Sequence, residues 1–279
     1  MPSRSGSVIG PVVTLAWWQQ HRDGVVLADV RWYLDGRSGR DAYDHGHLPG
    51  AVFVDLDRWL SGDGGPDSGR HPLPAPAVFA AGMTELGIAD DDTVVAYDDA
   101  GGTTAARLVW MLRATGHAAA LLDGGLSAYD GPLEQAAPPR PPALFTPRPW
   151  PAERLAGIED AMDPASVVLD ARDRNRYRGD YEPVDPRPGH IPGARSVPCR
   201  ENLGADGTFL PAAQLRERFR DAGVTDGAAV VSYCGSGVTA CHNLLALEHA
   251  GLGQGRLYPG SWSHYSHTSR PAATGDAPG

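Results

Sequence analysis

The chain has 279 residues, of which 42% are hydrophobic and 21% are charged, as expected for a soluble protein long enough to form two domains. Its formal net charge of −10 argues against nucleic acid or an anionic membrane as the main partner, although a small anionic ligand can bind where local charge opposes this balance. Three cysteines are a poor basis for a disulfide framework. We expect a cytoplasmic protein with free thiols, no signal peptide and no membrane span.

The same series of sequence blocks occurs twice along the chain. Each copy has an apolar β-rich run, a Gly-His-x-Pro-Gly-Ala block, a helix-like segment, a second β-rich run leading into a helix-like pattern, and a Gly-containing turn. Matching blocks occupy 25–31 and 167–173, 46–60 and 189–203, 73–88 and 209–224, 92–112 and 228–247, and 121–129 and 256–265. Several matched blocks in one order indicate a duplicated domain.

A proline-rich segment separates the two copies. Eight of the 22 residues from 132 to 153 are proline, a composition that favours an extended, semi-rigid spacer. We therefore predict a first domain at 1–137, a linker at 138–153 and a second domain at 154–279.

Short β-branched runs alternate with helical patterns in each copy. The runs at 167–169 and 230–233 have the character of buried parallel strands, and 214–222 and 240–250 carry apolar residues near helical spacing. This alternation predicts an α/β fold in which each domain has a parallel β-sheet flanked by helices. Ligands of such sheets bind beyond the carboxyl ends of the strands, and Cys234 directly follows one strand.

The loop after this strand combines a thiol with two glycines, which let successive backbone N–H groups turn inward. Such a nest beside a helix N-terminus binds anions and would stabilise a thiolate or a persulfide. Cys234 is therefore a candidate covalent nucleophile, and the alternative is a buried structural cysteine before an ordinary turn. The residues that would cradle the sulfur and the substrate are Gly235, Ser236, Gly237, Val238 and Thr239.

Two kinds of cysteine chemistry fit a cradle loop. A phosphatase of the Cys-x5-Arg type needs an arginine six residues after the nucleophile, to bind phosphate bidentately. In this chain that position is Ala240, so a phosphatase would lack the cation that binds its substrate. Sulfur transfer needs no arginine inside the loop.

The motifs CGSGVTA, GHIPGA and YPGSWSHY, on a duplicated α/β chain, resemble the two-domain rhodanese family of sulfurtransferases over roughly residues 10 to 275. The loop is similar to the Cys-Gly-Ser/Thr-Gly-Val-Thr of 3-mercaptopyruvate sulfurtransferases, whereas thiosulfate sulfurtransferases more often have Cys-Arg-Lys-Gly-Val-Thr. The resemblance implies sulfur transfer from 3-mercaptopyruvate, a small anionic donor, through a persulfide to thioredoxin, another thiol or cyanide. No metal or organic cofactor is implied. Thiosulfate as the donor, and a non-catalytic persulfide carrier, remain alternatives.

The resemblance also assigns roles to residues of the first copy. Asp98 stands where the second copy has Cys234, so the first domain should be non-catalytic. Residues at the positions of Asp57 and His71 approach the loop of the other domain in this family. They would form a relay with Ser236 that assists deprotonation of the substrate thiol. Without the resemblance, His71 would more often be a surface-loop histidine.

An arginine-rich stretch at 170–194 is a plausible site for the substrate carboxylate, because arginine binds carboxylates bidentately. Arg176 precedes an aromatic residue, as one such arginine does in the related enzymes. The family's second arginine comes nine residues later, where this chain has Asp185, and Arg187 is the nearest replacement. Arg172 and Arg174 are expected on a solvated charged face.

Other histidines and cysteines are expected to be structural. His47 and His190 recur in both copies although only one copy has the thiol, so they should order the turn before the next strand. Cys199 and Cys241 should be buried small apolar side chains. The spacing of the cysteines and histidines is unsuitable for a metal site.

Overall fold

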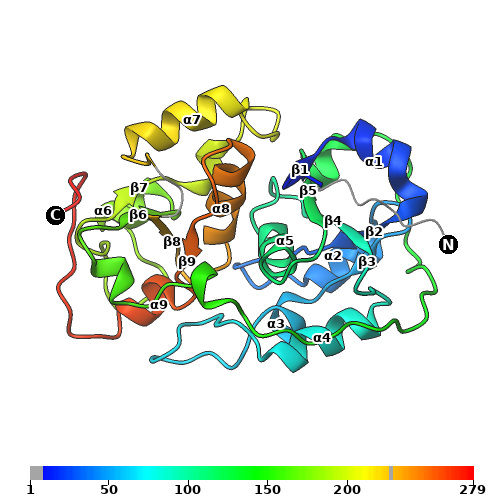
Figure 1. Ribbon diagram of the computed structural model, residues 1–279, viewed down its shortest axis with the longest axis horizontal. Coiled ribbons are helices and arrows are strands. Elements are labelled where there is room, and N and C mark those ends of the chain that lie inside the picture. The colour runs from blue at the N-terminus through cyan, green and yellow to red at the C-terminus, as the bar shows by residue number, and fades with distance from the viewer. Residues whose placement is uncertain (1–8, 226–228) are drawn as a thin grey trace.

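The computed structural model describes residues 9–225 and 229–279, so residues 1–8 of the predicted first domain lie outside the described residues. Each half contains an all-parallel sheet (Figure 1). The first has the strand order β1-β5-β4-β2-β3, and the second has β7-β6-β8-β9. The strands are β1 (Val12–Val13), β2 (Val25–Asp29), β3 (Val52–Phe53), β4 (Thr93–Tyr97), β5 (Ala119–Leu122), β6 (Val167–Asp170), β7 (Arg195–Ser196), β8 (Val230–Tyr233) and β9 (Arg256–Leu257).

The two sheets are built alike. The order β5-β4-β2-β3 corresponds strand by strand to β9-β8-β6-β7, and Leu155 makes a parallel bridge to Leu257 where β1 pairs with β5 in the first sheet. The α/β class with two domains of one fold is therefore confirmed. The predicted strands at 167–169 and 230–233 are confirmed as β6 and β8.

Helices flank both sheets. They are α1 (Leu15–His21), α2 (Gly39–His45), α3 (Leu56–Trp59), α4 (Pro76–Glu85), α5 (Ala105–Ala114), α6 (Arg174–Arg178), α7 (Ala212–Asp221), α8 (Ala240–His249) and α9 (Ser261–Tyr265), with 3₁₀ turns at Arg22–Gly24, Gly125–Ala128, Ala152–Arg154, Asp160–Met162 and Cys199–Asn202. The helices predicted at 214–222 and 240–250 are confirmed as α7 and α8. No helix in the described part of the chain is long and apolar enough to cross a membrane.

Helices α5 and α8 pack against each other where the two domains meet (Figure 1). Ala105–Leu112 of α5 and Ala240–Leu247 of α8 are buried on all sides, because each helix lies between its own sheet and the other domain. Leu108 and Leu244 belong to one continuous apolar core. The two domains therefore meet in a packed apolar interface, which fixes the positions of the loops that precede α5 and α8.

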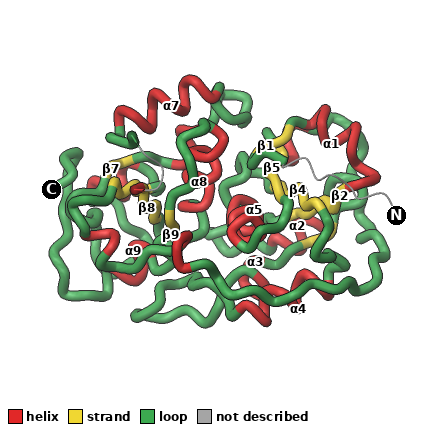
Figure 2. The backbone as a smooth tube through the Cα atoms, viewed as in Figure 1, coloured by secondary structure: helices red, strands yellow, loops and turns green. Residues whose placement is uncertain are grey.

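The segment 129–151, which contains most of the predicted linker, has no helix or strand (Figure 2). It is nevertheless held against the first domain. Phe145 and Trp150 pack on Phe79 of α4, and Trp150 Nε1 donates a 2.8 Å hydrogen bond to the Pro74 carbonyl. The apolar anchors therefore fix a segment whose proline content already limits its freedom.

The repeated histidines support the same turn in both domains. His47 stacks on Tyr43 with ring centroids 3.8 Å apart, and His190 stacks on Tyr177 at 3.7 Å. Each histidine Nδ1 lies within hydrogen-bonding distance of its tyrosine's carbonyl oxygen, at 2.9 and 2.8 Å. The contacts are equivalent in both domains although only the second domain has the thiol, which supports the structural role predicted for both histidines.

Candidate active site

Cys234 lies immediately after β8, six residues before α8 begins at Ala240. Its side chain is nearly buried, at 2% exposure, and borders a cavity of about 470 Å³. Both domains contribute to the wall. The second domain supplies the cradle loop, and the first supplies Trp32, Tyr33, Asp99, Thr103 and Thr104. The thiol therefore faces a space that neither domain encloses alone.

The short segment before α9 supports the backbone of this loop. The Cys234 N–H donates to Ser261 Oγ at 3.1 Å, and the Cys234 carbonyl accepts from the Trp262 N–H at 3.0 Å. Ser261 has φ of 51°, a left-handed conformation that is uncommon for a residue with a side chain. The loop holds this conformation because Ser261 Oγ also donates to the Tyr258 carbonyl at 2.9 Å.

Gly237 brings a backbone donor to the sulfur. Its N–H donates to Cys234 Sγ at 3.1 Å, and its φ is 81°. A methyl group at this position would stand 2.5 Å from the Pro259 carbonyl oxygen, so the close approach requires glycine. The arrangement supports negative charge on Sγ or on a second sulfur attached to it.

Ser236 meets His71 across the domain boundary. Their Oγ and Nδ1 atoms are 2.7 Å apart. Burial lowers the pKa of His71 to about 4, and the nearby Arg107 and Arg70 cations act in the same direction. His71 is therefore neutral at pH 7 and can accept a proton from the hydroxyl.

Asp57 lies at a longer distance from this pair. Its Oδ1 is 3.6 Å from His71 Nε2, and its side chain is 64% exposed. Its Oδ2 accepts a 3.0 Å hydrogen bond from Trp32 Nε1, and the Trp32 ring packs edge-on to His71. Asp57 is thus brought near the histidine by α3, but the gap exceeds a direct hydrogen bond.

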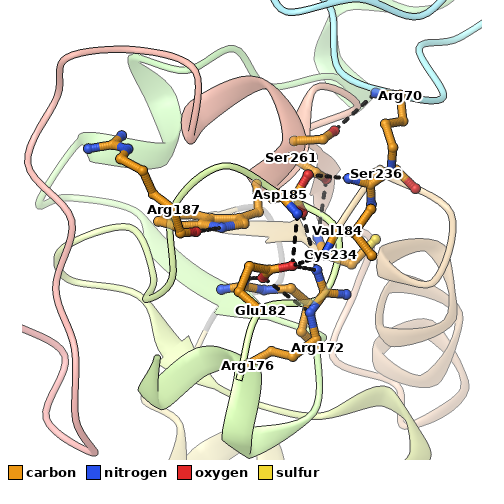
Figure 3. A network of polar contacts seen from close by, with 12 residues as sticks. Arg70, Arg172, Arg176, Glu182, Val184, Asp185, Arg187, Cys234, Ser236 and Ser261 are labelled. Atoms are coloured by element: carbon orange, nitrogen blue, oxygen red, sulfur yellow. Dashed lines mark hydrogen bonds and ion pairs between the residues drawn. The ribbon is translucent and has the colours of Figure 1, made fainter. Parts of the chain in front are cut away.

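The arginines of 170–194 occupy very different places. Arg176 borders the cavity, whereas Arg187 directs its guanidinium away from Cys234 and donates to the carbonyls of Tyr265, Ser266 and Arg270 (Figure 3). Arg174 is exposed and paired with Glu201, as expected. The expectation for Arg172 was wrong: it is 4% exposed and paired with Asp170.

Arg107 is a buried cation that the sequence analysis did not single out. It lies in α5 with no exposed surface and donates to the carbonyls of Leu60, His71 and Gly237. No carboxylate pairs with it among the described residues. An arginine in the first turns of a helix that is apolar from Leu108 to Leu112 was the signal that could have identified it.

The loop equivalent to the cradle in the first domain is filled by its own side chain. Asp98 follows β4 and is 1% exposed. Its carboxylate accepts four backbone N–H groups, at distances of 2.7 to 2.9 Å, from Ala100, Gly102, Thr104 and Ala105. The loop of the first domain is therefore an anion nest that its own carboxylate fills.

The other two cysteines are buried free thiols, as predicted. Burial raises the pKa of Cys199 and of Cys241 to about 12, so neither competes as a thiolate at neutral pH. Among the described residues there is no group of three or more His, Cys, Asp or Glu side chains that could hold a metal ion.

The two halves of the chain both match one family model. The model for the rhodanese-like domain matches residues 14–131 and again residues 155–268. The chain belongs to the rhodanese family. Cys234 and Asp98 thus occupy equivalent loops of two rhodanese-like domains.

Curated relatives carry two different names. "Probable 3-mercaptopyruvate sulfurtransferase" of Pseudomonas aeruginosa is 42% identical over 266 residues, covering 90% of this chain and 93% of the relative. "Putative thiosulfate sulfurtransferase SseB" of Mycobacterium tuberculosis is also 42% identical, over 282 residues, covering 98% and 99%. The human 3-mercaptopyruvate sulfurtransferase is 35% identical, covering 88% and 86%.

Solved structures share the two-domain arrangement. The 3-mercaptopyruvate sulfurtransferase from Leishmania major matches with a TM-score of 0.85 at 31% identity, covering 97% of this chain and 77% of that one. SseA from Escherichia coli, described as a 3-mercaptopyruvate sulfotransferase, matches with a TM-score of 0.79 at 32% identity, covering 91% and 100%.

Proposed function

We propose that this rhodanese-family protein is a sulfurtransferase that moves sulfur from 3-mercaptopyruvate through a persulfide on Cys234. The observation that carries the proposal is the position of Sγ: it accepts the Gly237 N–H in a loop that opens on the shared cavity. Gly235, Val238 and Thr239 complete the cradle on that side. The names of the human, Leishmania and Escherichia coli relatives support this donor.

The first half-reaction forms the persulfide. The Cys234 thiolate attacks the sulfur of the donor, a sulfur–sulfur bond forms and the carbon–sulfur bond breaks. The bonding electron pair passes to C3 of the donor, which takes the proton that the thiol loses. Pyruvate leaves, and Cys234 carries a persulfide anion beside the Gly237 N–H.

Ser236 and His71 would carry that proton. His71 is neutral at pH 7, so it can receive the proton of Ser236 while Ser236 accepts the proton of the substrate thiol. The same proton then returns to C3 of the departing pyruvate. Asp57 would assist by orienting His71 through Nε2, a weaker role in keeping with its 3.6 Å separation and its exposure.

The second half-reaction regenerates the thiolate. A thiol acceptor such as thioredoxin attacks the outer sulfur of the persulfide, and the sulfur–sulfur bond to Cys234 breaks. The acceptor leaves as a persulfide that keeps the proton of its thiol, and Cys234 is left as the thiolate. Cyanide can attack the same sulfur and leave as thiocyanate. The scheme requires no cofactor. Three free cysteines suit a reducing cytoplasm, which we propose as the compartment.

The first domain is proposed to be non-catalytic and to complete the cavity wall. We place it at 1–137, with the linker at 138–153 and the catalytic domain at 154–279. Asp98 supports this division of labour, because a carboxylate that accepts four N–H groups fills the nest and cannot carry sulfur.

Thiosulfate is the second candidate donor. It is favoured by the Mycobacterium tuberculosis relative's name and by two arginines, Arg70 and Arg176, that border the cavity. Cations beside the loop suit a dianion. Comparing kcat/KM for the two donors separates the candidates, and a larger value for thiosulfate would replace 3-mercaptopyruvate as the preferred donor.

Intact-mass measurement after addition of 3-mercaptopyruvate tests the mechanism. We expect one added sulfur atom on the wild type, equimolar pyruvate, and neither product with Cys234→Ser. Cys241→Ser is the matched control and should load sulfur normally. Absence of added sulfur on the wild type with either donor would refute the persulfide mechanism, and loading without turnover would favour a persulfide carrier.

A further inference from the structure

Two guanidinium groups, one from each domain, converge beside the nucleophile. A methyl group on Gly235 would stand 3.1 Å from Nη2 of Arg70 and 3.3 Å from Nη1 of Arg176. Both nitrogens therefore approach one spot, a single residue beyond Cys234. Among the described residues neither nitrogen has a hydrogen-bond acceptor, although both arginines border the cavity.

Two buried carboxylates hold the same arginines through their other nitrogens (Figure 3). Glu182 accepts from Arg176 Nε at 3.2 Å and Nη2 at 2.6 Å. Asp185 accepts from Arg176 Nη2 at 3.1 Å and from Arg70 Nη1. The carboxylates are 3% and 2% exposed and do not border the cavity, so they orient the guanidinium groups before any ligand arrives.

The loop that carries Arg70 is fixed to the second domain. The loop between α3 and α4 extends beneath α9 (Figure 1). The backbone N–H of Arg70 donates to Ser263 Oγ at 3.0 Å. Gly69, with φ of 83°, approaches so closely that a methyl group there would stand 2.4 Å from the Gly260 carbonyl oxygen. Arg70 therefore has a defined position relative to Cys234, although it belongs to the other domain.

We propose that Arg70 and Arg176 bind the substrate carboxylate together, so that a cation from the non-catalytic domain completes the carboxylate site. The proposal rests on the proposed function in that the carboxylate is that of 3-mercaptopyruvate. Asp185, at the position where the resemblance calls for a second arginine, brings in Arg70 from the other domain. Arg187 is committed to three carbonyls and takes no part. Arg70 thereby selects thiols that carry a carboxylate over uncharged thiols.

Calorimetric titration with pyruvate tests the site without any sulfur chemistry. We expect Arg70→Met to raise the dissociation constant for pyruvate at least about tenfold, because a charge-assisted hydrogen bond is lost. Arg70→Lys should recover part of the affinity, since it keeps the charge and loses the planar fork. Arg37→Met is the matched control. It removes a cation from the cavity rim that pairs with Asp35 and is 66% exposed, and it should stay within about twofold of the wild type.

Equal affinities of Arg70→Met and the wild type would overturn the proposal, as would an equal loss in Arg37→Met or a wild type that binds no pyruvate. A second measurement uses mercaptoacetone, an α-mercapto ketone like 3-mercaptopyruvate in which a methyl group replaces the carboxylate. Arg70→Met should slow persulfide formation from 3-mercaptopyruvate about tenfold and leave the rate with mercaptoacetone unchanged. Equal slowing with both donors would assign Arg70 a general role and overturn its role in specificity. A wild type that binds pyruvate but never gains sulfur would refute the proposed function and leave the carboxylate site intact.

Discussion

The loops that follow β4 and β8 occupy equivalent places in the two domains, but the first is filled by a carboxylate and the second carries a thiol. In the first, the Asp98 carboxylate accepts four backbone N–H groups; in the second, Cys234 Sγ accepts one, from Gly237. The first loop is also one residue longer, since α5 begins seven residues after Asp98 and α8 begins six after Cys234. An anion nest that is filled by its own chain is a structural element. An equivalent loop with a thiol can bind a sulfur atom reversibly, as a persulfide.

The comparison predicts that stability depends on the first loop and chemistry on the second. Asp98→Ala leaves four N–H donors without their acceptor, and we expect a loss of about 3 kcal/mol or more in the free energy of unfolding. Burial raises the pKa of the Asp98 carboxyl, and the four N–H groups oppose that rise because they stabilise its charged form. Urea unfolding of Asp98→Ala and Cys234→Ala measures the difference, and the cysteine variant should lose less than about 1 kcal/mol.

Asp99→Ala is the control for this first prediction. Asp99 is the next residue, is exposed and accepts a hydrogen bond from Tyr33 at 2.6 Å, so its removal should cost less than about 1 kcal/mol. A loss for Asp98→Ala no larger than that for Asp99→Ala would contradict the view that the first nest is structural.

A hydroxyl relay should distinguish the second loop from the first. Ser236→Ala removes the hydroxyl that lies 2.7 Å from His71, and we expect kcat for 3-mercaptopyruvate to fall about a hundredfold with KM nearly unchanged. His71→Asn should have a similar effect, and the double variant should be little worse than either, because the two side chains act as one unit. Steady-state kinetics measure all three.

Thr103→Ala is the matched control for the relay. Thr103 is a buried residue of the first loop that borders the same cavity, so its hydroxyl should matter less than about threefold in kcat. Independent, additive effects of the Ser236 and His71 variants would show that the two residues do not share a proton.

Local patterns explain which parts could be predicted from the sequence. β8 is a short β-branched run, the cradle is a contiguous loop, and the duplication exposes Asp98 at the cysteine position, so these features need no knowledge of distant contacts. Arg172 could also have been found in this way. The buried pair Asp170–Arg172 repeats Asp29–Arg31 of the first domain, and the shared Asp-x-Arg pattern is visible in the sequence.

Contacts between segments far apart in sequence explain the rest. Arg187 lies close in sequence to the expected clamp position, but the chain after α9 supplies carbonyls that bind its guanidinium. Arg70 precedes His71 in a loop of the other domain, and its partner Asp185 lies 115 residues away. Spacing rules cannot detect a pair formed by domain packing.

The cation beneath the second loop should affect thiol reactivity. Arg107 lies fully buried and donates to the Gly237 carbonyl at 2.9 Å, so its charge favours the anionic form of nearby sulfur. We expect Arg107→Met to slow alkylation of Cys234 by iodoacetamide at pH 7 about tenfold, and Arg107→Lys to restore most of the rate. Peptide mass spectrometry measures labelling at Cys234 specifically.

Arg113→Met controls for disturbance of the domain interface. Arg113 lies on the same helix and pairs with Glu248 of α8 at 2.5 Å, but it makes no contact with the cradle. Its variant should label Cys234 at the wild-type rate. Faster labelling in Arg107→Met would mean that Arg107 mainly keeps the domains closed, contrary to an electrostatic role.

The smallest expected effect concerns the histidine that serves only the second loop. The pKa of His71 is about 4 because the side chain is buried near two cations, so the neutral form should persist from pH 7 to pH 5.5 with less than about a 10% change in protonation. An ordinary histidine would be mostly protonated at pH 5.5. The unfolded chain binds a proton at His71 near pH 6.5 and the folded chain near pH 4. The stability that neutral His71 contributes to the fold is therefore fully present above pH 6.5 and is lost as the pH falls toward 4.

An NMR titration of the His71 ring, assigned with His71→Asn, measures the midpoint of protonation without interference from Cys234. A midpoint near 6.5 would mean that the ring is hydrated and charged at mildly acidic pH, and His71 could not then serve as the proton acceptor of Ser236 there.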